Sequence, residues 1–443
     1  DDPNLSLQRG RIHEFFKYTK PHRKLLEQIE LVIIDEISMV RADIIDAIDR
    51  ILRVYSHNLR EPFGGKQLLL VGDVFQLEPV VKNDEREILN RFYPTPYFFS
   101  ARVFGQIDLV SIELQKVYRQ TDPVFVGVLD HIRNNTAGAA DLQLLNTRYG
   151  SQIEESEADM YITLATRRDT VDSINEKKLA ELPGDPITFE GVIEGDFPES
   201  SLPTSQELVL KPGAQIIFIK NDFDRRWVNG TIGVIAGIDE EEETIYVITD
   251  DGKECDVKRE SWRNIRYRYN EKTKEIEEEV LGSFTQYPIR LAWAITVHKS
   301  QGLTFSRVVI DFTGGVFAGG QAYVALSRCT SLDGIQLKKP IHRADIFVRP
   351  EIVNFAGRFN DRQAIDKALK QAQADVQYAA AARAFDKGDM EECLEQFFRA
   401  IHSRYDIEKP VPRRLIRRKL GIINTLKEQN KKLKEQMREQ QER

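Results

Sequence analysis

Apolar runs that end in acidic residues mark the beginning of this chain. Leu31–Ile34 is an unbroken apolar run that leads directly into Asp35 and Glu36. Residues 67–71 repeat the pattern and lead into Gly72 and Asp73. Short unbroken apolar runs are typical of parallel strands that are buried on both faces. The pattern therefore predicts an α/β fold in which two strands deliver polar residues to one edge of a sheet.

Two adjacent carboxylates at such a strand end suit a nucleoside triphosphate site. Asp35 can hold Mg²⁺ through water, and Glu36 can orient or deprotonate an attacking water. Gln76, shortly after the second strand, has both a donor and an acceptor for sensing a γ-phosphate and its water. The alternative is a strand that ends at a polar edge with two solvated acids. The second strand with the same kind of ending makes that alternative harder to accept.

Five segments in a fixed order resemble the motifs of superfamily-one helicases. DEIS at 35–38 resembles the Walker B box and GDVFQL at 72–77 the third motif. LQKVYRQ at 114–120, AITVHKSQGLTF at 294–305 and YVALSR at 323–328 resemble the fourth, fifth and sixth motifs. The helical apolar spacing at 43–53, followed by PFGG at 62–65, resembles the Pif-type (petite-integration-frequency) family of class B. This resemblance extends from about Gly10 to Pro350.

The resemblance implies ATP and Mg²⁺ as cofactors. It places Asp35, Gln301 and Gly302 at the nucleotide, with Asp35 holding the metal. It makes Glu36 and Gln76 catalytic groups. Arg119 and Arg328 would be arginine fingers, since a guanidinium meets phosphate oxygens bidentately and stays charged. For Arg119 alone a surface ion pair is the simpler interpretation, and the order of the motifs favours the finger.

The same resemblance implies single-stranded DNA and junctions of single and double strands as partners. Thr296, His298 and Lys299 would contact the DNA backbone. GRIHEFF at 10–16 resembles a DNA-contacting segment of the family, in which His13 and Phe15 would meet phosphate and base, although an amphipathic helix with a buried Phe explains it equally well. Arg225 and Trp227 form a basic-aromatic loop that is a further candidate, and an ordinary exposed loop is the alternative.

One motif of the superfamily is missing from these 443 residues. No GxxxxGK[ST] segment precedes Asp35. Gly65-Lys66 supplies a Gly-Lys pair, but Arg60 stands where the first Gly is needed and Gln67 replaces Ser or Thr. We expect the first motor domain to be incomplete and this chain to hydrolyse little ATP. A homologue that has lost ATPase activity is the alternative.

The predicted architecture is two RecA-like motor domains, the first N-terminally incomplete, with an inserted small barrel that resembles the Src-homology-three (SH3) fold, and a helical C-terminal tail. The short strands and turns that follow Leu208 predict the barrel. The expected boundaries are 1–153 for the first motor domain, 154–205 for a linker and the start of the second, 206–284 for the barrel, 285–350 for the rest of the second motor domain and 351–443 for the tail.

The tail contains two patterns outside the motor. Residues 381–400 resemble one tetratricopeptide helix pair. Ile416, Ile423, Asn430 and Met437 fall seven residues apart, with Leu426 and Leu433 between them. This short heptad seam predicts coiled-coil self-association or a protein partner. A single basic helix that lies on its own protein is the alternative.

Composition limits these interpretations. The net charge of -7 predicts no strong bulk attraction to nucleic acid, so DNA binding would need a local basic path. Three widely spaced cysteines indicate reduced thiols in an intracellular protein of cytoplasm, nucleus or mitochondrion, and no apolar stretch predicts a membrane segment. The implied function is 5′-to-3′ translocation and unwinding of duplex or G-quadruplex DNA in genome maintenance. The alternatives are a RecD-like or relaxase-associated helicase domain, or a non-hydrolysing single-strand-binding scaffold.

Overall fold

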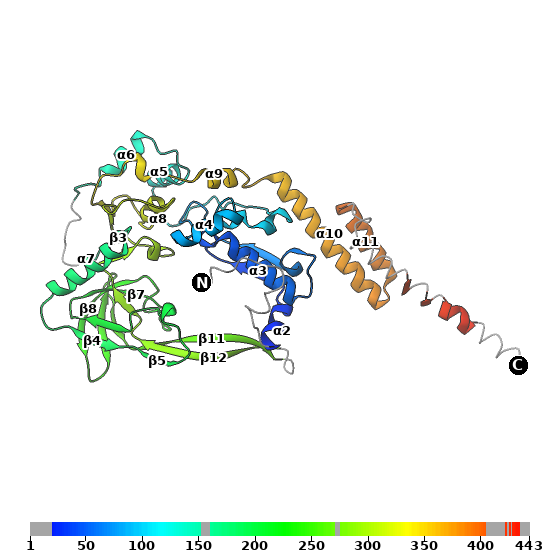
Figure 1. The fold of residues 1–443 in the computed structure, drawn as a ribbon, viewed down its shortest axis with the longest axis horizontal. Helices are drawn as coiled ribbons and strands as arrows, with labels where there is room; N and C mark the ends of the chain where they lie inside the picture. The colour runs from blue at the N-terminus through cyan, green and yellow to red at the C-terminus, as the bar shows by residue number, and fades with distance from the viewer. Residues whose placement is uncertain are drawn as a thin grey trace. The chain divides into compact units, whose positions relative to one another are not determined.

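The computed structural model describes residues 20–151, 160–270, 275–404, 421–422, 425–426 and 428–434 (Figure 1). The chain divides into two compact units. The motor unit comprises residues 1–109 and 114–357, and the tail unit comprises residues 110–113 and 358–443. His13 and Phe15 lie outside the described residues, as do Ile416, Ile423 and Met437 of the heptad seam.

A parallel pair of strands begins the motor unit. Strands β1 (Leu31–Ile34) and β2 (Gln67–Leu70) pair with Ile34 beside Leu70. Helices α2 (Lys20–Gln28), α3 (Ala42–Tyr55) and α4 (Asn83–Phe92) belong to the same region. The expectation that both faces of these strands are buried is not met, because Leu31 and Ile33 are 45% and 59% exposed. Val32 and Ile34, on the other face of β1, are half-buried among the described residues.

Helix α3 organises the loops around this pair through buried acids as well as apolar residues. Asp46 accepts hydrogen bonds from the backbone N–H of Val103 (3.0 Å) and from the Tyr93 hydroxyl (2.9 Å). Asp49 accepts from Arg53 Nε (2.9 Å) and from the Phe63 N–H (2.6 Å). Buried polar groups are stable when they are paired in this way, so the acids of α3 fix loops far along the chain.

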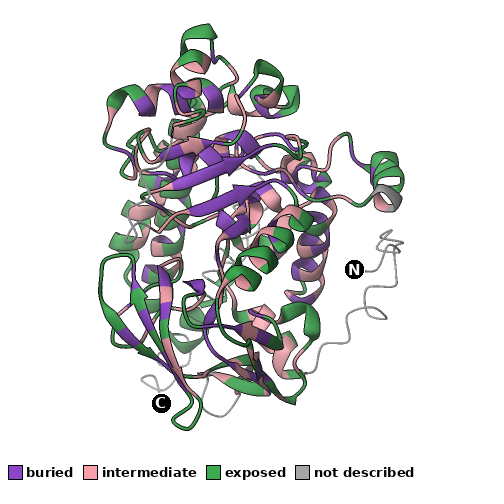
Figure 2. Cartoon of the chain, turned by 90° about the vertical axis from the view of Figure 1, so that its left-hand side faces the viewer, coloured by how far each residue is buried: buried purple, intermediate pink, exposed green. Residues whose placement is uncertain are grey.

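The second sheet is wholly parallel, with strand order β14-β3-β15-β16. The strands are β3 (Ile162–Ala165), β14 (Ala294–Thr296), β15 (Val308–Asp311) and β16 (Ile335–Leu337). Every residue of β3 and of β15 is buried, including the polar Thr163 and Asp311 in otherwise apolar sequences, and buried strands are purple in Figure 2. Helices α7 (Arg168–Glu181) and α8 (Gln321–Ser327) accompany this sheet, whereas Phe355 of α9 (Pro350–Ala356) stacks on Phe99 with ring centroids 4.4 Å apart. These parallel strands and helices confirm the predicted α/β class.

Two helices assigned by sequence to the first motor domain pack with the second sheet. They are α5 (Pro123–Arg133) and α6 (Ala139–Asn146). Phe125 and Ile132 of α5 and Leu145 of α6 belong to the same buried cluster as Ile162 of β3. The same cluster contains Leu77 of the first motor domain, so these helices pack where the two motor domains meet, and the boundary at 153 remains a prediction.

The insertion between α7 and β14 is made of antiparallel strands. A five-stranded sheet has the order β10-β9-β8-β7-β13, and its core contains Phe218, Trp227 and Tyr287. A long ribbon of β11 and β12 pairs with β5, and β4 pairs with β6 (Figure 1). The bounds are β4 (Ile187–Glu190), β5 (Val192–Gly195), β6 (Glu207–Leu210), β7 (Gln215–Phe218), β8 (Ile232–Asp239), β9 (Thr244–Thr249), β10 (Glu254–Val257), β11 (Glu260–Asn270), β12 (Glu275–Gln286) and β13 (Ile289–Leu291).

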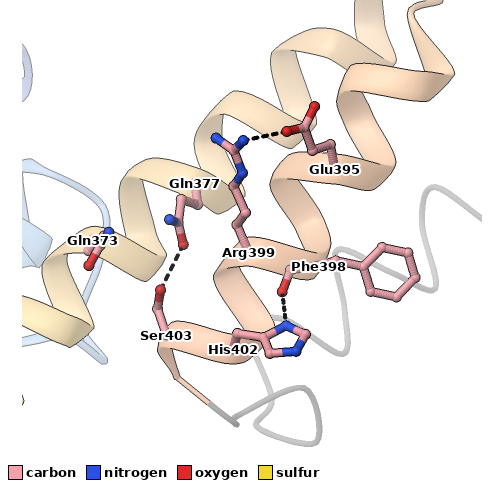
Figure 3. A pocket seen from close by; sticks show the side chains of 7 residues that line it. All are labelled: Gln373, Gln377, Glu395, Phe398, Arg399, His402 and Ser403. Carbon is pink, nitrogen blue, oxygen red and sulfur yellow. Dashed lines mark hydrogen bonds and ion pairs between the residues drawn. The ribbon is translucent and has the colours of Figure 1, made fainter.

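The tail unit is a helical hairpin of α10 (Arg362–Lys387) and α11 (Met390–Ser403). Gly388 lies at φ 83°, a left-handed conformation that ends α10 without steric cost, and Asp389 caps α11 by accepting from the Glu392 N–H at 3.1 Å. An open pocket lies along the hairpin, where Ser403 donates to Gln377 at 3.0 Å (Figure 3). Leu426 and Leu433 of the heptad seam are 55% and 56% exposed. No described helix of the chain has the length and apolar character needed to cross a bilayer.

Candidate nucleotide and DNA site

The ends of β1 and β2 are tied together at the backbone. The Ile37 N–H donates to the Val71 carbonyl at 3.0 Å, directly after the two strands end. A Cβ on Gly72 would lie 2.9 Å from the Ile37 nitrogen, so only glycine fits here. Glu36 has φ 49° and ψ 44°, a left-handed conformation that is uncommon for a side chain of this size. The Glu36 N–H donates to Asp35 Oδ1 at 2.8 Å, which fixes the two predicted acids side by side. Strained backbone of this kind is often found at functional sites.

The turn after β2 is held by an arginine that sequence reasoning missed. Asp73 accepts from Arg133, with Oδ1 to Nη2 at 3.2 Å and Oδ2 to Nε at 3.3 Å. The Arg133 guanidinium also lies over the Phe75 ring, 4.4 Å from its centroid. Asp73 in turn accepts from the Phe75 N–H, and its carbonyl accepts from the Gln76 N–H at 3.0 Å. Arg133 thus positions the turn that carries Gln76. Its only sequence signal is its place as the last residue of α5.

Gln76 and Arg328 meet across the two motor domains. Arg328 Nη2 lies 3.4 Å from Gln76 Oε1, although the residues are far apart in sequence. Arg328 is 2% exposed and also donates to the Val324 and Leu303 carbonyls. Gly320, at φ 75°, brings the second domain so close that a Cβ there would lie 2.2 Å from the Gln76 carbonyl oxygen. The third and sixth motifs therefore contact each other, and their catalytic roles remain a prediction.

Neighbouring groups and burial change the pKa of the Arg328 guanidinium. Burial, as the largest cause, and the nearby Arg119 lower the pKa of Arg328 to about 10, against the opposing effects of Tyr323, Glu36 and Asp73. Arg119 Nη1 donates to the Ser327 carbonyl at 3.3 Å. Two guanidinium groups that lie together, with two carboxylates close by, form an arrangement that an anion such as a phosphate would stabilise. The structure thus brings together Glu36, Gln76, Arg119 and Arg328.

Two buried side-chain amide nitrogens in this region lack a hydrogen-bond partner in the part of the chain that the structure describes. Gln301 Nε2 and Gln321 Nε2 are buried donors without a hydrogen-bond acceptor among the described residues. A buried donor that is left unpaired costs free energy, so each indicates a group that the protein chain does not supply. Gln301 is one of the predicted nucleotide-binding residues. Together with the Asp35 carboxylate and the paired arginines, it fits a nucleoside triphosphate with Mg²⁺ in this part of the molecule.

The loop after β14 carries the predicted DNA contacts. Thr296 ends β14, and its hydroxyl accepts from the Lys299 N–H at 3.2 Å. Burial lowers the pKa of His298, which favours a neutral imidazole that can donate a hydrogen bond. The pKa of Lys299 is lowered by burial and by Arg290 and Arg168, while Asp172 raises it. Cations crowd around Lys299, an arrangement that attracts phosphate.

Gly302 completes this loop at φ 76°, where a Cβ would meet no atom within 4 Å. The conformation, and not crowding, is what requires glycine there. The predicted role of Gly302 beside the nucleotide remains a prediction.

The two candidate residues of the basic-aromatic loop differ in exposure in the structure. Trp227 is 5% exposed, and its ring stacks on Phe218 with centroids 4.4 Å apart inside the insertion core. Arg225 is exposed, while Arg226 is paired with Asp222 and Asp256. The indole of Trp227 therefore packs the insertion and does not face solvent.

The Gly-Lys pair at 65–66 has a structural role. Lys66 Nζ donates to the carbonyls of Glu27 (3.2 Å) and Ile29 (2.5 Å), where helix α2 ends. A cation at this position satisfies orphan carbonyls and interacts favourably with the helix dipole. Lys66 thus joins α2 to β2 and does not point into a phosphate loop.

Comparison with known proteins gives a consistent result. The family described as PIF1-like helicase matches residues 12–132. The ATP-dependent DNA helicase Pif1 of Campylobacter jejuni is 33% identical over 329 residues, which are 71% of this chain and 70% of the relative. Vertebrate relatives of the same name match as well, but the chain spans only about half of their length, for example 45% of the human protein.

Solved structures agree with the sequence comparison. A crystal structure of Bacteroides Pif1 with ADP-AlF4 has a TM-score of 0.70 and 40% identity, and the match covers 77% of each chain. The Bacteroides protein bound to single-stranded DNA has a TM-score of 0.58 at 40% identity, with coverage of 79% and 80%. At 40% sequence identity, both matches support membership of the same family in addition to a shared fold.

Proposed function

Because this chain belongs to the PIF1-like helicase family, we propose that it is the motor of an ATP-dependent DNA helicase that moves 5′ to 3′ on single-stranded DNA and separates duplex DNA. ATP with Mg²⁺ would bind beside Asp35, and single-stranded DNA would lie along the loop from Thr296 to Lys299. Junctions of single and double strands are the proposed substrates, in genome maintenance.

The contact between Gln76 and Arg328 is the observation that carries this proposal. It joins the two motor domains, and Glu36 is close enough to this contact to raise the pKa of Arg328. A γ-phosphate placed there would be sensed by Gln76 from one domain and by Arg328 from the other. Release of the γ-phosphate after hydrolysis would change the contact between the two domains. Such a change can convert a cycle of nucleotide binding and hydrolysis into movement. When it is bound, Mg²⁺ would neutralise phosphate charge, and Glu36 would take a proton from the attacking water.

ATP hydrolysis by a polypeptide of these 443 residues is expected to be negligible. The residues contain no GxxxxGK[ST] segment, so the backbone donors, the lysine and the Mg²⁺-binding hydroxyl of a P-loop are all missing. A steady-state ATPase assay with and without single-stranded DNA measures this directly. Ordinary helicase turnover would contradict the prediction, and restored turnover after fusion of a P-loop segment to residue 1 would support both it and the proposed function.

Two kinds of DNA contact are expected in the loop after β14. Lys299→Gln removes a charge from a crowded cationic site and should reduce the slope of log affinity against log salt by about 0.7, the value for one phosphate of a single strand. Thr296→Ala with His298→Ala should lower the affinity evenly across sequences and leave the slope unchanged, because burial lowers the pKa of His298 and favours its neutral form.

These effects are measured with labelled oligonucleotides of two compositions at several salt concentrations. Lys177→Gln is the matched control, since Lys177 is 78% exposed on α7 in the same motor domain. If Lys299→Gln keeps the parent slope, or if Lys177→Gln lowers it equally, this loop is not the path of the DNA backbone.

A further inference from the structure

The loop that joins β7 to β8 carries an exposed aromatic side chain to which the proposed function assigns no role. This loop, residues 219–231, is called the barrel loop. Phe223 lies in it and is 98% exposed, more than any other large apolar residue among those described. A single exposed apolar side chain is common on protein surfaces, so the surroundings of Phe223 decide whether it can bind a ligand. The other aromatic of the loop, Trp227, is buried.

The barrel loop holds Phe223 outward through a fixed network. The Asp222 carboxylate accepts from the Asp224 N–H (3.0 Å), the Arg226 N–H (3.1 Å) and Arg226 Nη2 (2.8 Å). Arg226 Nη1 reaches Asp256 Oδ1 on β10 at 2.7 Å. The turn is therefore closed on both sides of Phe223 and attached to the sheet. An aromatic ring on a fixed turn binds at a low entropic cost, because little is left to be ordered.

The barrel loop is continuous with the loop proposed to hold DNA. Gly230, at φ 97°, lies so close to Leu303 that a Cβ would come 2.8 Å from Leu303 Cδ2. Leu303 directly follows Gly302 in the fifth motif. Ile219, at the start of the barrel loop, and Ile232, the first residue of β8, pack in the same cluster as Val297. The position of the barrel loop is thus fixed against the loop that carries Thr296 and His298.

The chemistry around Phe223 suits a nucleic acid base. Residues 220–226 contain three basic side chains and two acidic ones; Arg226 is paired with Asp222, whose pKa it lowers, and Lys220 is paired with Glu260 at 2.8 Å. Arg225 stays exposed beside Phe223 for a phosphate. Proteins that bind single strands combine basic groups with aromatic rings on which bases stack. This pairing is present here on a single turn.

We propose that Phe223 stacks on an unpaired base of single-stranded DNA as the strand leaves the loop from Thr296 to Lys299. This inference rests on the proposed function, since it assigns one base contact to the same DNA path. The ring adds affinity without sequence preference, because every base has a face on which it can stack.

The test compares two oligonucleotides of equal length, one of thymidines and one of abasic sites, by fluorescence anisotropy with the 443-residue chain. Phe223→Ala should weaken binding of the thymidine strand by about 5- to 150-fold, the contribution of one stacked base, and should leave binding of the abasic strand unchanged. Phe223→Trp should retain the parent affinity, while Phe223→Leu should lose it, since leucine is apolar but cannot stack.

Tyr246→Ala is the matched control, because Tyr246 is 45% exposed on β9 of the same sheet and should not affect binding. Thermal unfolding of Phe223→Ala should match the parent, since a ring so fully exposed contributes little packing. If Phe223→Ala binds both strands like the parent while Thr296→Ala with His298→Ala still weakens binding, the stacking proposal fails and the DNA path stands. If the parent binds neither strand, both proposals fail.

Discussion

Replacing Arg328 by alanine is expected to lower DNA-stimulated ATP hydrolysis by about 10³-fold or more, in a form of the protein that carries a P-loop segment. Arg328 comes from the second motor domain and reaches Gln76 of the first at 3.4 Å. A guanidinium in this position stabilises charge that develops on a transferred phosphoryl group. Because Arg328 is 2% exposed, its charge is little screened by water, which strengthens its interaction with a phosphate.

Single-turnover hydrolysis and the affinity for a fluorescent ATP analogue, measured separately, distinguish catalysis from binding. Arg119→Ala is the companion variant, since Arg119 lowers the pKa of Arg328 and so lies within range of the same phosphate. Thermal unfolding must accompany the assay, because the Val324 and Leu303 carbonyls lose a donor when Arg328 is removed. A stable Arg328→Ala protein with near-normal turnover would assign Arg328 to the domain interface alone.

Glu36→Gln is expected to keep nucleotide binding and to slow hydrolysis by about 10²- to 10⁴-fold, the contribution of a general base. Glutamine preserves the size of the side chain and the left-handed backbone at φ 49°, but it cannot accept a proton from water. The hydrogen bond from the Glu36 N–H to Asp35 is unaffected by the change, so the second acid keeps its position.

Quenched-flow measurement of the chemical step with saturating ATP tests this expectation. Glu30→Gln is the matched control: Glu30 is exposed at the opposite end of β1, and its loss should not alter the rate. Unchanged hydrolysis in Glu36→Gln would show that another group activates water. Equal losses in both variants would point to a general effect of charge on this strand.

Local sequence pattern was sufficient for the strands and for the residues that follow them. The apolar runs at 31–34 and 67–70 form the parallel pair β1 and β2, and the acids follow β1 as predicted. The predicted helix at 43–53 lies within α3. These features depend on neighbours in sequence, such as an apolar run, a helical period or a glycine at a strand end, and so they can be read without the fold.

Contacts between residues far apart in sequence were decided only by the tertiary structure. Arg133 supports Asp73 because α5 lies against the second sheet, a packing choice that apolar spacing leaves open. Lys66 caps α2 instead of cradling a phosphate, because α2 ends beside β2.

The barrel loop gives the clearest contrast between sequence and structure. The sequence by itself determined that a basic and aromatic segment lies between two strands of the insertion. It could not say which ring faces water. Phe223 and Trp227 are both aromatic, and their different exposure depends on which of them lies against the core of the sheet. Trp227 stacks on Phe218 inside that core, and Asp222 turns Phe223 away from it. Burial is a property of the whole packed chain, and for that reason only the tertiary structure could decide it.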